Sequence, residues 1–479
     1  MVGREQELEQ LKAAYSSDKS EFVAVYGRRR VGKTFLISEC FGNRFSFSHA
    51  GMEGAPLREQ LENFRLSLWR QGYRSCPRFK SWLAAFSELE RFLEACPDRR
   101  KVVFIDELPW LDTPRSGFLR AFESFWNGWA CLRKDIVLVI CGSATSWIVK
   151  KVLRNRGGLH NRVTCHIPLR QFTLAECEEY VRYAGLGFDR LQMLECYMAM
   201  GGVAYYWSLL KKGESAAQNL DRIFFGEWDV MRAEFKEVFS SLFKDEGRYV
   251  DIITALGRTK AGMTREEIVR ALGGKCGGEV STCLEELETC GFIRHYRNFG
   301  NEKKGTLFQL IDCYTLFYFR FLEHPDTDGH YWSASLNTPT VNNWRGLAFE
   351  RVCLLHIAEI KAALGIAGIL SEVYSWQAAK TADGERGAQI DLLIDRADRM
   401  INLCEMKYAD GEYEMKAAEY ERIRHRRESF QRHSRTTKGL QLTMVTPVGL
   451  KHNKYWGNVQ RVVTLDDLFG TASTNWARP

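Results

Sequence analysis

The sequence predicts an α/β protein of several domains, with a parallel sheet in its first third. Three observations lead to this prediction. The 479 residues exceed what one hydrophobic core usually serves and correspond to roughly three domains. Apolar runs of strand length alternate with helical patterns in the first third, as in buried parallel sheets. Two further strand-like runs stand close together in the last third, behind a region of short helices.

The composition is that of an ordinary globular protein, with 45% hydrophobic and 27% charged residues. No apolar run reaches eighteen residues, and the opening MVGREQELEQL lacks the apolar core of a signal peptide. We therefore expect a cytoplasmic protein without a membrane partner. The 14 cysteines form no CxxC pair and are expected to be reduced core thiols, including Cys276, Cys283 and Cys290 at seven-residue spacing.

The net charge of +7 permits contact with nucleic acid without requiring it. Residues 421–435, ERIRHRRESFQRHSR, form a strongly basic helical pattern. Two interpretations stay open for it: a solvated helix face and a contact with a phosphate backbone.

The first chemical motif follows a short apolar run, Phe22 to Tyr26, and precedes a helical pattern. It reads GRRRVGKT and fits GxxxxGK[ST], the P-loop or Walker A motif, in the strand, loop and helix order that this motif needs. Its glycines let the backbone curve around a β-phosphate, Lys33 neutralises the β and γ oxygens, and Thr34 offers its hydroxyl to Mg²⁺. The residues expected to bind ATP are Gly27, Arg28, Arg29, Arg30, Val31, Gly32, Lys33, Thr34 and Phe35.

The second motif, KVVFIDELPW, is a buried strand that ends in two acids. Asp106 is expected to hold Mg²⁺, usually through water. Glu107 is placed to polarise the water that attacks the γ-phosphate. A strand ending in two surface acids is a poor alternative once a P-loop lies upstream.

A third strand, DIVLVICGSATSW, ends in small polar residues where P-loop ATPases with an extra sheet strand place a γ-phosphate sensor. Ser143 is the first candidate and Thr145 the second. Arg162 stands immediately before a further strand, TCHIPLRQF, at the usual place of an arginine that reaches a neighbouring subunit's γ-phosphate. A surface salt bridge is the alternative for Arg162.

Residues 1–210 resemble the archaeal-type ATPase family of the AAA+ and STAND group, through VGREQELEQL, GRRRVGKT, VVFIDELPWL, CGSATSW, GGLHNRV and GGVAYYW. The resemblance implies a five-stranded parallel sheet and a small helical lid. It also implies that Val2, Gly3 and Arg4 lie near the adenine and that the pair at 201–202 lies in the lid. Two departures bear on nucleotide affinity and lid rigidity: the chain begins at the valine of the aromatic-Val-Gly-Arg-Glu box, and Ala204 replaces the usual proline.

Residues 248–312 have the outline of a winged helix-turn-helix, with YVDIITALGR, TREEIVRAL and GGEVSTCLEELETCGFI as its helices. Thr264 and Glu267 form a capping box at the start of the second helix. HYRNFGNEKKGTLFQLID is the expected wing. Acids on the recognition helix favour packing between domains over DNA reading, whereas a basic wing keeps a backbone contact open. The acids are Glu279, Glu285, Glu286 and Glu288; the wing bases are Arg294, Arg297, Lys303 and Lys304.

The last third holds a second catalytic candidate. A helix, NWRGLAFERVCLLHI, carries Glu350; the strand GAQIDLLIDR carries Asp391; and the strand INLCEMKYAD carries Glu405 and Lys407. Residues two apart on a strand share a face, so the two strands, paired through ADRM, bring two carboxylates and a lysine together. Asp391 and Glu405 are expected to hold Mg²⁺ while Lys407 activates a water for phosphodiester attack.

This arrangement resembles the PD-(D/E)xK nuclease superfamily, in the form of the DUF234 domain often found behind these ATPases. Trp376 in SEVYSWQ and the sequence EMKY are further points of contact. A surface ion pair of Glu405 with Lys407, or a nuclease-like fold without cleavage, is the alternative.

The predicted domains are an ATPase core (1–170), a helical lid (171–243), a winged helix-turn-helix (244–325) and an α/β restriction-endonuclease-like domain (326–479). The predicted function is ATP hydrolysis with Mg²⁺, coupled to a nuclease-like domain that acts on DNA. The alternative is a nucleotide-controlled switch or scaffold whose C-terminal part only binds DNA or protein. A homo-oligomer fits the expected role of Arg162 in a neighbouring subunit's site.

Overall fold

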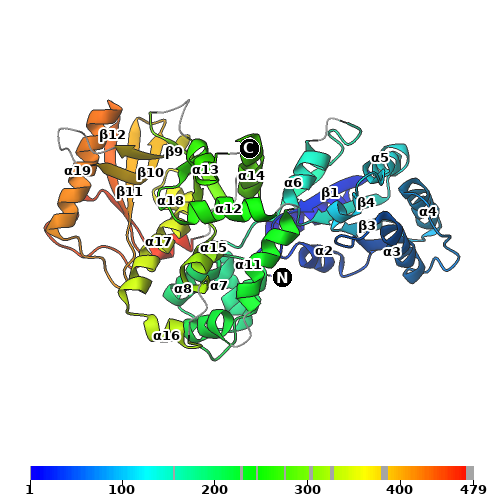
Figure 1. The fold of residues 1–479 in the computed structure, drawn as a ribbon, viewed down its shortest axis with the longest axis horizontal. Coiled ribbons are helices and arrows are strands. Elements are labelled where there is room, and N and C mark those ends of the chain that lie inside the picture. The colour runs from blue at the N-terminus through cyan, green and yellow to red at the C-terminus, as the bar shows by residue number, and fades with distance from the viewer. Residues whose placement is uncertain are drawn as a thin grey trace. The chain divides into compact units, whose positions relative to one another are not determined.

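The computed structural model describes residues 2–154, 157–226, 230–243, 246–274, 277–300, 306–323, 328–378 and 387–470 (Figure 1). The chain divides into two compact units. The first contains Met1–Gln171 and Ser240–Lys244, and the second contains Phe172–Phe239 and Asp245–Pro479. The segment predicted as a helical lid therefore belongs mostly to the second unit.

A five-stranded parallel sheet forms the centre of the first unit, as the resemblance implied (Figure 1). Its strand order is β2-β3-β4-β1-β5. Nearly every strand residue is buried in β1, β3 and β4, which explains their continuous apolar runs. The strands are β1 Glu21–Tyr26, β2 Phe47–Ala50, β3 Lys101–Asp106, β4 Ile136–Gly142 and β5 Cys165–Pro168.

Helices cover both faces of this sheet. Alternate residues of β1 enter two separate cores: Phe22 and Ala24 pack with α3, α4 and α5, whereas Val23 and Val25 pack with α1 and α2. The helices and turns of this unit are α1 Glu5–Ser16, α2 Lys33–Phe41, α3 Leu57–Arg70, α4 Trp82–Ala95, η1 Leu108–Leu111, α5 Phe118–Gly128, η2 Ala130–Leu132, α6 Thr145–Ile148 and η3 Val149–Leu153.

The second unit begins with short helices whose starts are set by capping boxes at Thr173, Asp189 and Ser215. Gly202 is required here, because a Cβ at this position would lie 1.9 Å from the carbonyl oxygen of Phe172. These helices are α7 Leu174–Ala184, α8 Arg190–Met200, α9 Ala204–Ser208, α10 Ala216–Leu220 and η4 Asp221–Phe225, followed by α11 Val230–Leu242.

A central module of helices and three short strands comes next. Thr264 and Glu267 form the predicted capping box. The strand β8 pairs antiparallel with both β6 and β7. The elements are α12 Glu246–Gly257, β6 Met263–Thr264, α13 Arg265–Ala271, α14 Gly277–Thr289, β7 Ile293–Asn298, β8 Leu307–Leu310, α15 Cys313–Phe317, η5 Tyr318–Leu322 and α16 Tyr331–Ser335.

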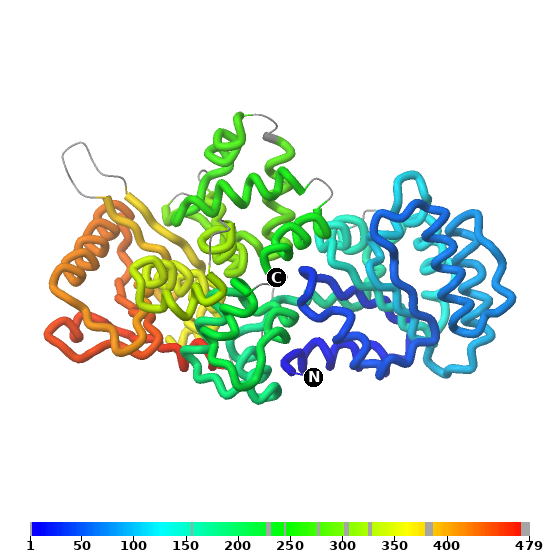
Figure 2. The backbone as a smooth tube through the Cα atoms, turned by 60° about the horizontal axis from the view of Figure 1, so that its bottom comes forward, coloured from blue at the N-terminus to red at the C-terminus, as the bar shows by residue number. Residues whose placement is uncertain are grey.

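The C-terminal module has a mixed sheet, which runs from yellow to red in Figure 2. Strands β9, β10 and β11 form an antiparallel meander that includes the predicted hairpin, whereas β12 and β13 extend the sheet in parallel. The elements are α17 Pro339–Leu355, α18 Ile357–Ala363, β9 Ser371–Ala378, β10 Ala388–Arg396, β11 Met400–Met406, α19 Ala417–Ser434, β12 Gly439–Val445, η6 Trp456–Asn458, β13 Arg461–Val463 and α20 Leu465–Leu468.

One sheet is shared by the central and C-terminal modules, on either side of the predicted boundary at residues 325 and 326. Its order is β13-β12-β11-β10-β9-β7-β8-β6. The junction is a short parallel pairing in which Arg297 lies opposite Tyr374 and Asn298 opposite Ser375. Sequence patterning could not reveal this, because any strand can satisfy the backbone groups of an open sheet edge.

Two expectations from composition can be examined in the described part of the chain. The thirteen cysteines there form no disulfide with one another, and nine of them are buried; Cys276 lies outside the described residues. Among the described helices, none combines the length and the apolar character needed to cross a bilayer.

Candidate functional site

The loop between β1 and α2 is shaped by close packing at its glycines. A Cβ on Gly27 would lie 2.1 Å from the carbonyl oxygen of Leu169, directly after β5. Gly32 caps α2 with a φ of 94°, a left-handed conformation that favours glycine. The N-terminus of α2 therefore opens from a tightly fixed loop, which is the geometry that binds phosphate.

Lys33 lies across this loop. Its Nζ donates to the carbonyl oxygens of Gly27 and Arg28, both at 3.0 Å, and to Oγ of Ser143 at 3.3 Å. The side chain is buried, and the described residues offer it no salt bridge. An ammonium held by neutral oxygens keeps its charge available for an anion.

Thr34 and Asp106 meet as the sequence predicted. The Thr34 hydroxyl donates to Oδ2 of Asp106 at 2.8 Å, although the two residues are 72 positions apart. A hydroxyl and a carboxylate are hard oxygen ligands of the kind that Mg²⁺ takes in phosphate sites. The residues present therefore fit an ATP-bound Mg²⁺.

Glu107 and Ser143 are joined by two hydrogen bonds. The Glu107 carboxylate accepts from the backbone N–H of Ser143 at 2.9 Å and from its hydroxyl at 2.5 Å. Glu107 has a left-handed backbone with a φ of 44°, which is uncommon for a residue with a side chain and is often found at functional sites. Thr145, the second sensor candidate, instead donates to the carbonyl oxygen of Ser143 at 3.2 Å.

The residues that the resemblance assigned to the adenine lie near the end of β5. Arg4 donates to the carbonyl oxygen of Arg170 at 2.7 Å and is buried, as is Gly3, whereas Val2 is half-buried. Phe35 is an exposed aromatic residue in the first turn of α2. Arg162 is exposed in a turn three residues before β5.

The second site is built from α17, β10 and β11. Glu350 is buried in α17. Leu392 of β10 pairs with Cys404 of β11, and Asp391 and Glu405 each stand one residue further from the turn of the hairpin. The hairpin thus carries the predicted carboxylates on neighbouring strands, with Lys407 immediately after β11.

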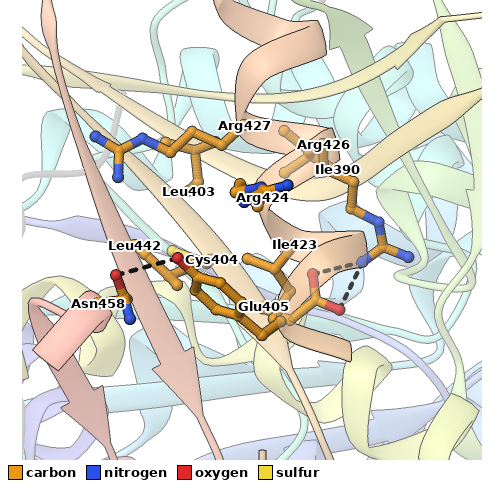
Figure 3. Close-up of a pocket in the computed structure, with 11 residues that line it drawn as sticks. Ile390, Leu403, Cys404, Glu405, Ile423, Arg424, Arg426, Arg427, Leu442 and Asn458 are labelled. Carbon is orange, nitrogen blue, oxygen red and sulfur yellow. Dashed lines mark hydrogen bonds and ion pairs between the residues drawn. The ribbon is translucent and has the colours of Figure 1, made fainter. Parts of the chain in front are cut away.

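Each of these acids faces a cation. Lys260 Nζ lies 2.7 Å from Oε1 of Glu350 and 4.0 Å from Oδ2 of Asp391. Lys407 Nζ lies 2.7 Å from Glu405 Oε1, and one nitrogen of Arg426 lies 2.7 Å from both oxygens of Glu405 (Figure 3). The sequence analysis missed Lys260, which stands in a loop without a motif, and it assigned no partner to Arg426 within the basic helix.

These pairings set the protonation of the acids. Burial and the nearby Asp391 raise the pKa of Glu350. Burial alone would raise the pKa of Glu405 as well, but Lys407 and Arg426 hold it below its ordinary value. Glu405 is therefore a firmly ionised partner of two cations.

The metal assignment changes accordingly. No group of three or more Asp, Glu, His or Cys side chains within the described ranges has the arrangement of a metal site. Both oxygens of Glu405 are already engaged, so a metal there would have to displace Arg426. Glu350 has a buried oxygen, Oε2, without a hydrogen-bond partner. A divalent cation at Glu350 and Asp391 would use this oxygen of Glu350, while the oxygens of Asp391 have Gln389 at 2.7 Å and Lys260 at 4.0 Å as neighbours.

Three of the acids of α14 pair within the central module. Glu279 pairs with Arg248, Glu286 accepts from Tyr249, and Glu288 contacts His295. On the predicted wing, Arg294 is half-buried and donates to Gln309 at 2.8 Å, whereas Arg297 is exposed. Lys303 and Lys304 lie outside the described residues.

The basic helix α19 borders a hollow beside the second site (Figure 3). Its floor is apolar, with Ile390, Leu403 and Leu442 among its residues. Arg424 and Arg427 line it from the helix, and Tyr420 donates to Asn458 at 3.3 Å. Three arginines of the predicted basic helix, Arg424, Arg426 and Arg427, thus line this hollow, and Arg424 and Arg427 are also exposed to solvent.

Comparison with known proteins found a family match and relatives in Methanocaldococcus jannaschii. Residues 1–210 match the family described as an ATPase domain predominantly from Archaea. An uncharacterized protein of Methanocaldococcus jannaschii is 24% identical over 432 residues, which cover 85% of this chain and 88% of that protein. An uncharacterized ATP-binding protein of the same organism is 44% identical over 43 residues, 9% of this chain and 73% of that protein.

Solved structures are similar at low identity. The Walker-type ATPase of Pyrococcus abyssi is 16% identical with a TM-score of 0.48, over 67% of this chain and 96% of that one. The Aeropyrum pernix ORC2 protein is also 16% identical, with a TM-score of 0.39, over 72% and 94%. By the family match and by its own P-loop geometry, the segment of residues 1–210 contains an archaeal-type ATPase domain.

Proposed function

We propose that the first unit binds ATP with Mg²⁺ and hydrolyses it. The observation that carries this proposal is that Lys33, Glu107 and Ser143, which follow β1, β3 and β4 respectively, lie together. Thr34 lies beside Asp106 at the same place. Lys33 contacts the phosphate oxygens, and Glu107 orients and deprotonates the attacking water. Bound Mg²⁺ supplies positive charge to the phosphates.

Ser143 contacts both Lys33, which binds the phosphates, and Glu107, which activates the water. Its hydroxyl has one proton and two lone pairs. The hydroxyl donates a hydrogen bond to Glu107 and accepts one from Lys33. Binding of phosphate by Lys33 therefore affects the hydrogen bond that positions Glu107, the predicted base. The test is phosphate release from ATP by the purified chain, with nucleotide binding measured separately. Absence of both in the presence of Mg²⁺ would end the proposal.

We also propose a homo-oligomer in which Arg162 acts on a neighbouring subunit's nucleotide. Its exposure before β5 supports this role. Arg162→Ala should lower turnover without weakening ATP binding, and mixing it with a Glu107→Gln chain should restore part of the activity through mixed interfaces. A co-assembled mixture without rescue would contradict the role.

The second candidate function is a magnesium-dependent, PD-(D/E)xK-like nuclease module acting on DNA. The succession of α17, the antiparallel β9–β10–β11, α19 and the parallel β12 supports it. So do the contacts of Glu350 and Asp391 with the same lysine, Lys260, and the ion pair of Glu405 with Lys407. The order α12, β6, α13, α14, β7, β8 supports a winged helix-turn-helix in front of it.

In this proposal Glu350 and Asp391 hold the cation, and Lys407 orients the attacking water. The alternative is a nucleotide-controlled switch in which the same module binds without cleaving, and the full ion pairing of Glu405 favours it. One experiment separates the two. Labelled DNA is incubated with the full chain and Mg²⁺, with ATP, with a non-hydrolysable analogue and without nucleotide. Cleavage in any state supports the nuclease; intact DNA in all states supports the switch.

A further inference from the structure

Lys260 is held in place by its own backbone. It lies in the loop between α12 and β6, and its carbonyl oxygen accepts two hydrogen bonds. One comes from Gln309 of β8 at 2.8 Å and the other from Arg351 of α17 at 2.7 Å. Two donors from two different elements fix the point from which the side chain extends. The position of this lysine is therefore built by the fold, although 53% of its side chain is exposed.

The ammonium of Lys260 reaches both carboxylates that fit a cation. It lies 2.7 Å from Oε1 of Glu350 and 4.0 Å from Oδ2 of Asp391. Oε2 of Glu350 is buried and has no hydrogen-bond partner, so this acid still has an oxygen for a ligand. A positive charge between two carboxylates stands where a hard divalent ion binds such oxygens.

We propose that Lys260 is a resident counter-ion of this site and that a divalent cation binds Glu350 and Asp391 only by displacing its ammonium. This inference rests on the proposed nuclease function, because it concerns the cation that the function needs. The cation site is then shared by two modules: the acids come from the C-terminal module and the competing charge from the central one. Any movement of the loop at residues 258–262 changes the metal affinity.

The experiment measures Mn²⁺ binding by electron paramagnetic resonance on the full chain without nucleotide. Lys260→Met removes the charge and keeps an apolar stem of similar length. An ammonium about 4 Å from a divalent ion opposes its binding strongly, so this variant should bind Mn²⁺ about tenfold more tightly or better. Lys260→Arg, which keeps the charge, should retain the affinity of the wild type.

Two controls define the site. Arg258→Met removes a cation two positions earlier in the same loop, where the described residues provide no carboxylate partner, and it should leave Mn²⁺ binding unchanged. The gain from Lys260→Met should disappear when Asp391→Ala is added, which separates this site from Mn²⁺ held at Thr34 and Asp106.

The outcomes distinguish the inference from the function beneath it. Equal, Asp391-dependent affinity in the wild type and in Lys260→Met would overturn the role of Lys260 and leave the proposed metal site standing. If no variant binds Mn²⁺ in an Asp391-dependent way, the metal site fails and the inference fails with it. Thermal unfolding confirms that each variant is folded, and if Lys260→Met is not, Lys260→Gln takes its place with the same expected gain.

Discussion

The lysines of the two candidate sites differ in their partners: neutral oxygens at the P-loop and carboxylates at the second site. At the P-loop, Lys33 is held by two backbone carbonyls and one hydroxyl, and the described residues give it no acidic partner. At the second site, Lys260 and Lys407 each contact a carboxylate at 2.7 Å. The ammonium of Lys33 is therefore in no ion pair with a described residue, whereas Lys260 and Lys407 are each paired with an acid.

This difference has a chemical consequence. An anion such as a phosphate can bind at Lys33 without breaking an ion pair. A cation or a phosphodiester at the second site must first replace a partner, and breaking a buried ion pair is costly because it leaves a charge uncompensated. The P-loop site can therefore bind its ligand without breaking an ion pair, whereas a ligand of the second site must displace a paired residue.

The largest effects are expected at the P-loop site. Lys33→Ala should weaken ATP binding by more than about a hundredfold, because no other described cation takes the same position in the loop. Glu107→Gln should keep binding but slow hydrolysis by about 10²- to 10⁴-fold, since it removes the base. Calorimetric titration and phosphate release measure the two quantities.

Lys12→Ala, an exposed lysine of α1, is the matched control for charge and should change neither quantity. Equal hydrolysis rates for Glu107→Gln and the wild type would remove Glu107 from the mechanism.

At the second site, two substitutions should separate metal binding from DNA cleavage. Asp391→Ala should abolish Mn²⁺ binding at this site and plasmid nicking together, while Mn²⁺ held at Thr34 and Asp106 remains. Lys407→Met should retain Mn²⁺ binding and lower nicking by about a hundredfold, because the water loses its orienting charge. Asp395→Ala, four residues along β10 and paired with Lys438, is the control. Parallel loss of both properties in Lys407→Met would contradict the assignment.

A smaller effect is expected at Ser143, which lies between Lys33 and Glu107 at the P-loop site. Ser143→Ala removes the hydroxyl that contacts both Lys33 and Glu107 and should lower turnover by about tenfold, with ATP affinity little changed. Thr145→Ser keeps the hydroxyl that donates to the Ser143 carbonyl and should behave as the wild type. If Ser143→Ala hydrolyses ATP at the wild-type rate, the bridge has no catalytic role.

The smallest effect concerns pH and stability. His49, in β2, contacts Ser67 at 2.9 Å, and burial lowers its pKa from 6.5 to about 3. The unfolded chain therefore binds this proton more readily. The contribution of neutral His49 to stability is complete above the unfolded value and is lost as the pH falls from 6.5 towards 3, by up to about 1.4 kcal/mol per pH unit.

Urea unfolding at about pH 5 and about pH 7 measures this loss. His49→Phe, which packs against Phe64, should reduce the dependence on pH, whereas replacement of the exposed His166 by Gln should not. An unchanged dependence in His49→Phe would show that other groups cause it.

The family resemblance gave the five-stranded sheet, and local sequence gave the hairpin of β10 and β11 and the capping box at Thr264, because these depend on residues close in the chain. The joint sheet of the central and C-terminal modules was not predictable. The strand β7 carries no mark of its partner, since the pairing uses backbone groups that every residue has.

The sequence by itself determined the phosphate-binding loop, because strand, loop, lysine and threonine follow one another within the motif. It also named the acids carried by β3, β10 and β11, since alternation along a strand fixes the face of each side chain. Only the tertiary structure decided which charges these residues meet. Lys260 and Glu350 are 90 residues apart, and Ser143 and Glu107 are 36 apart. Such partners are chosen by packing across the fold, and no local pattern encodes them.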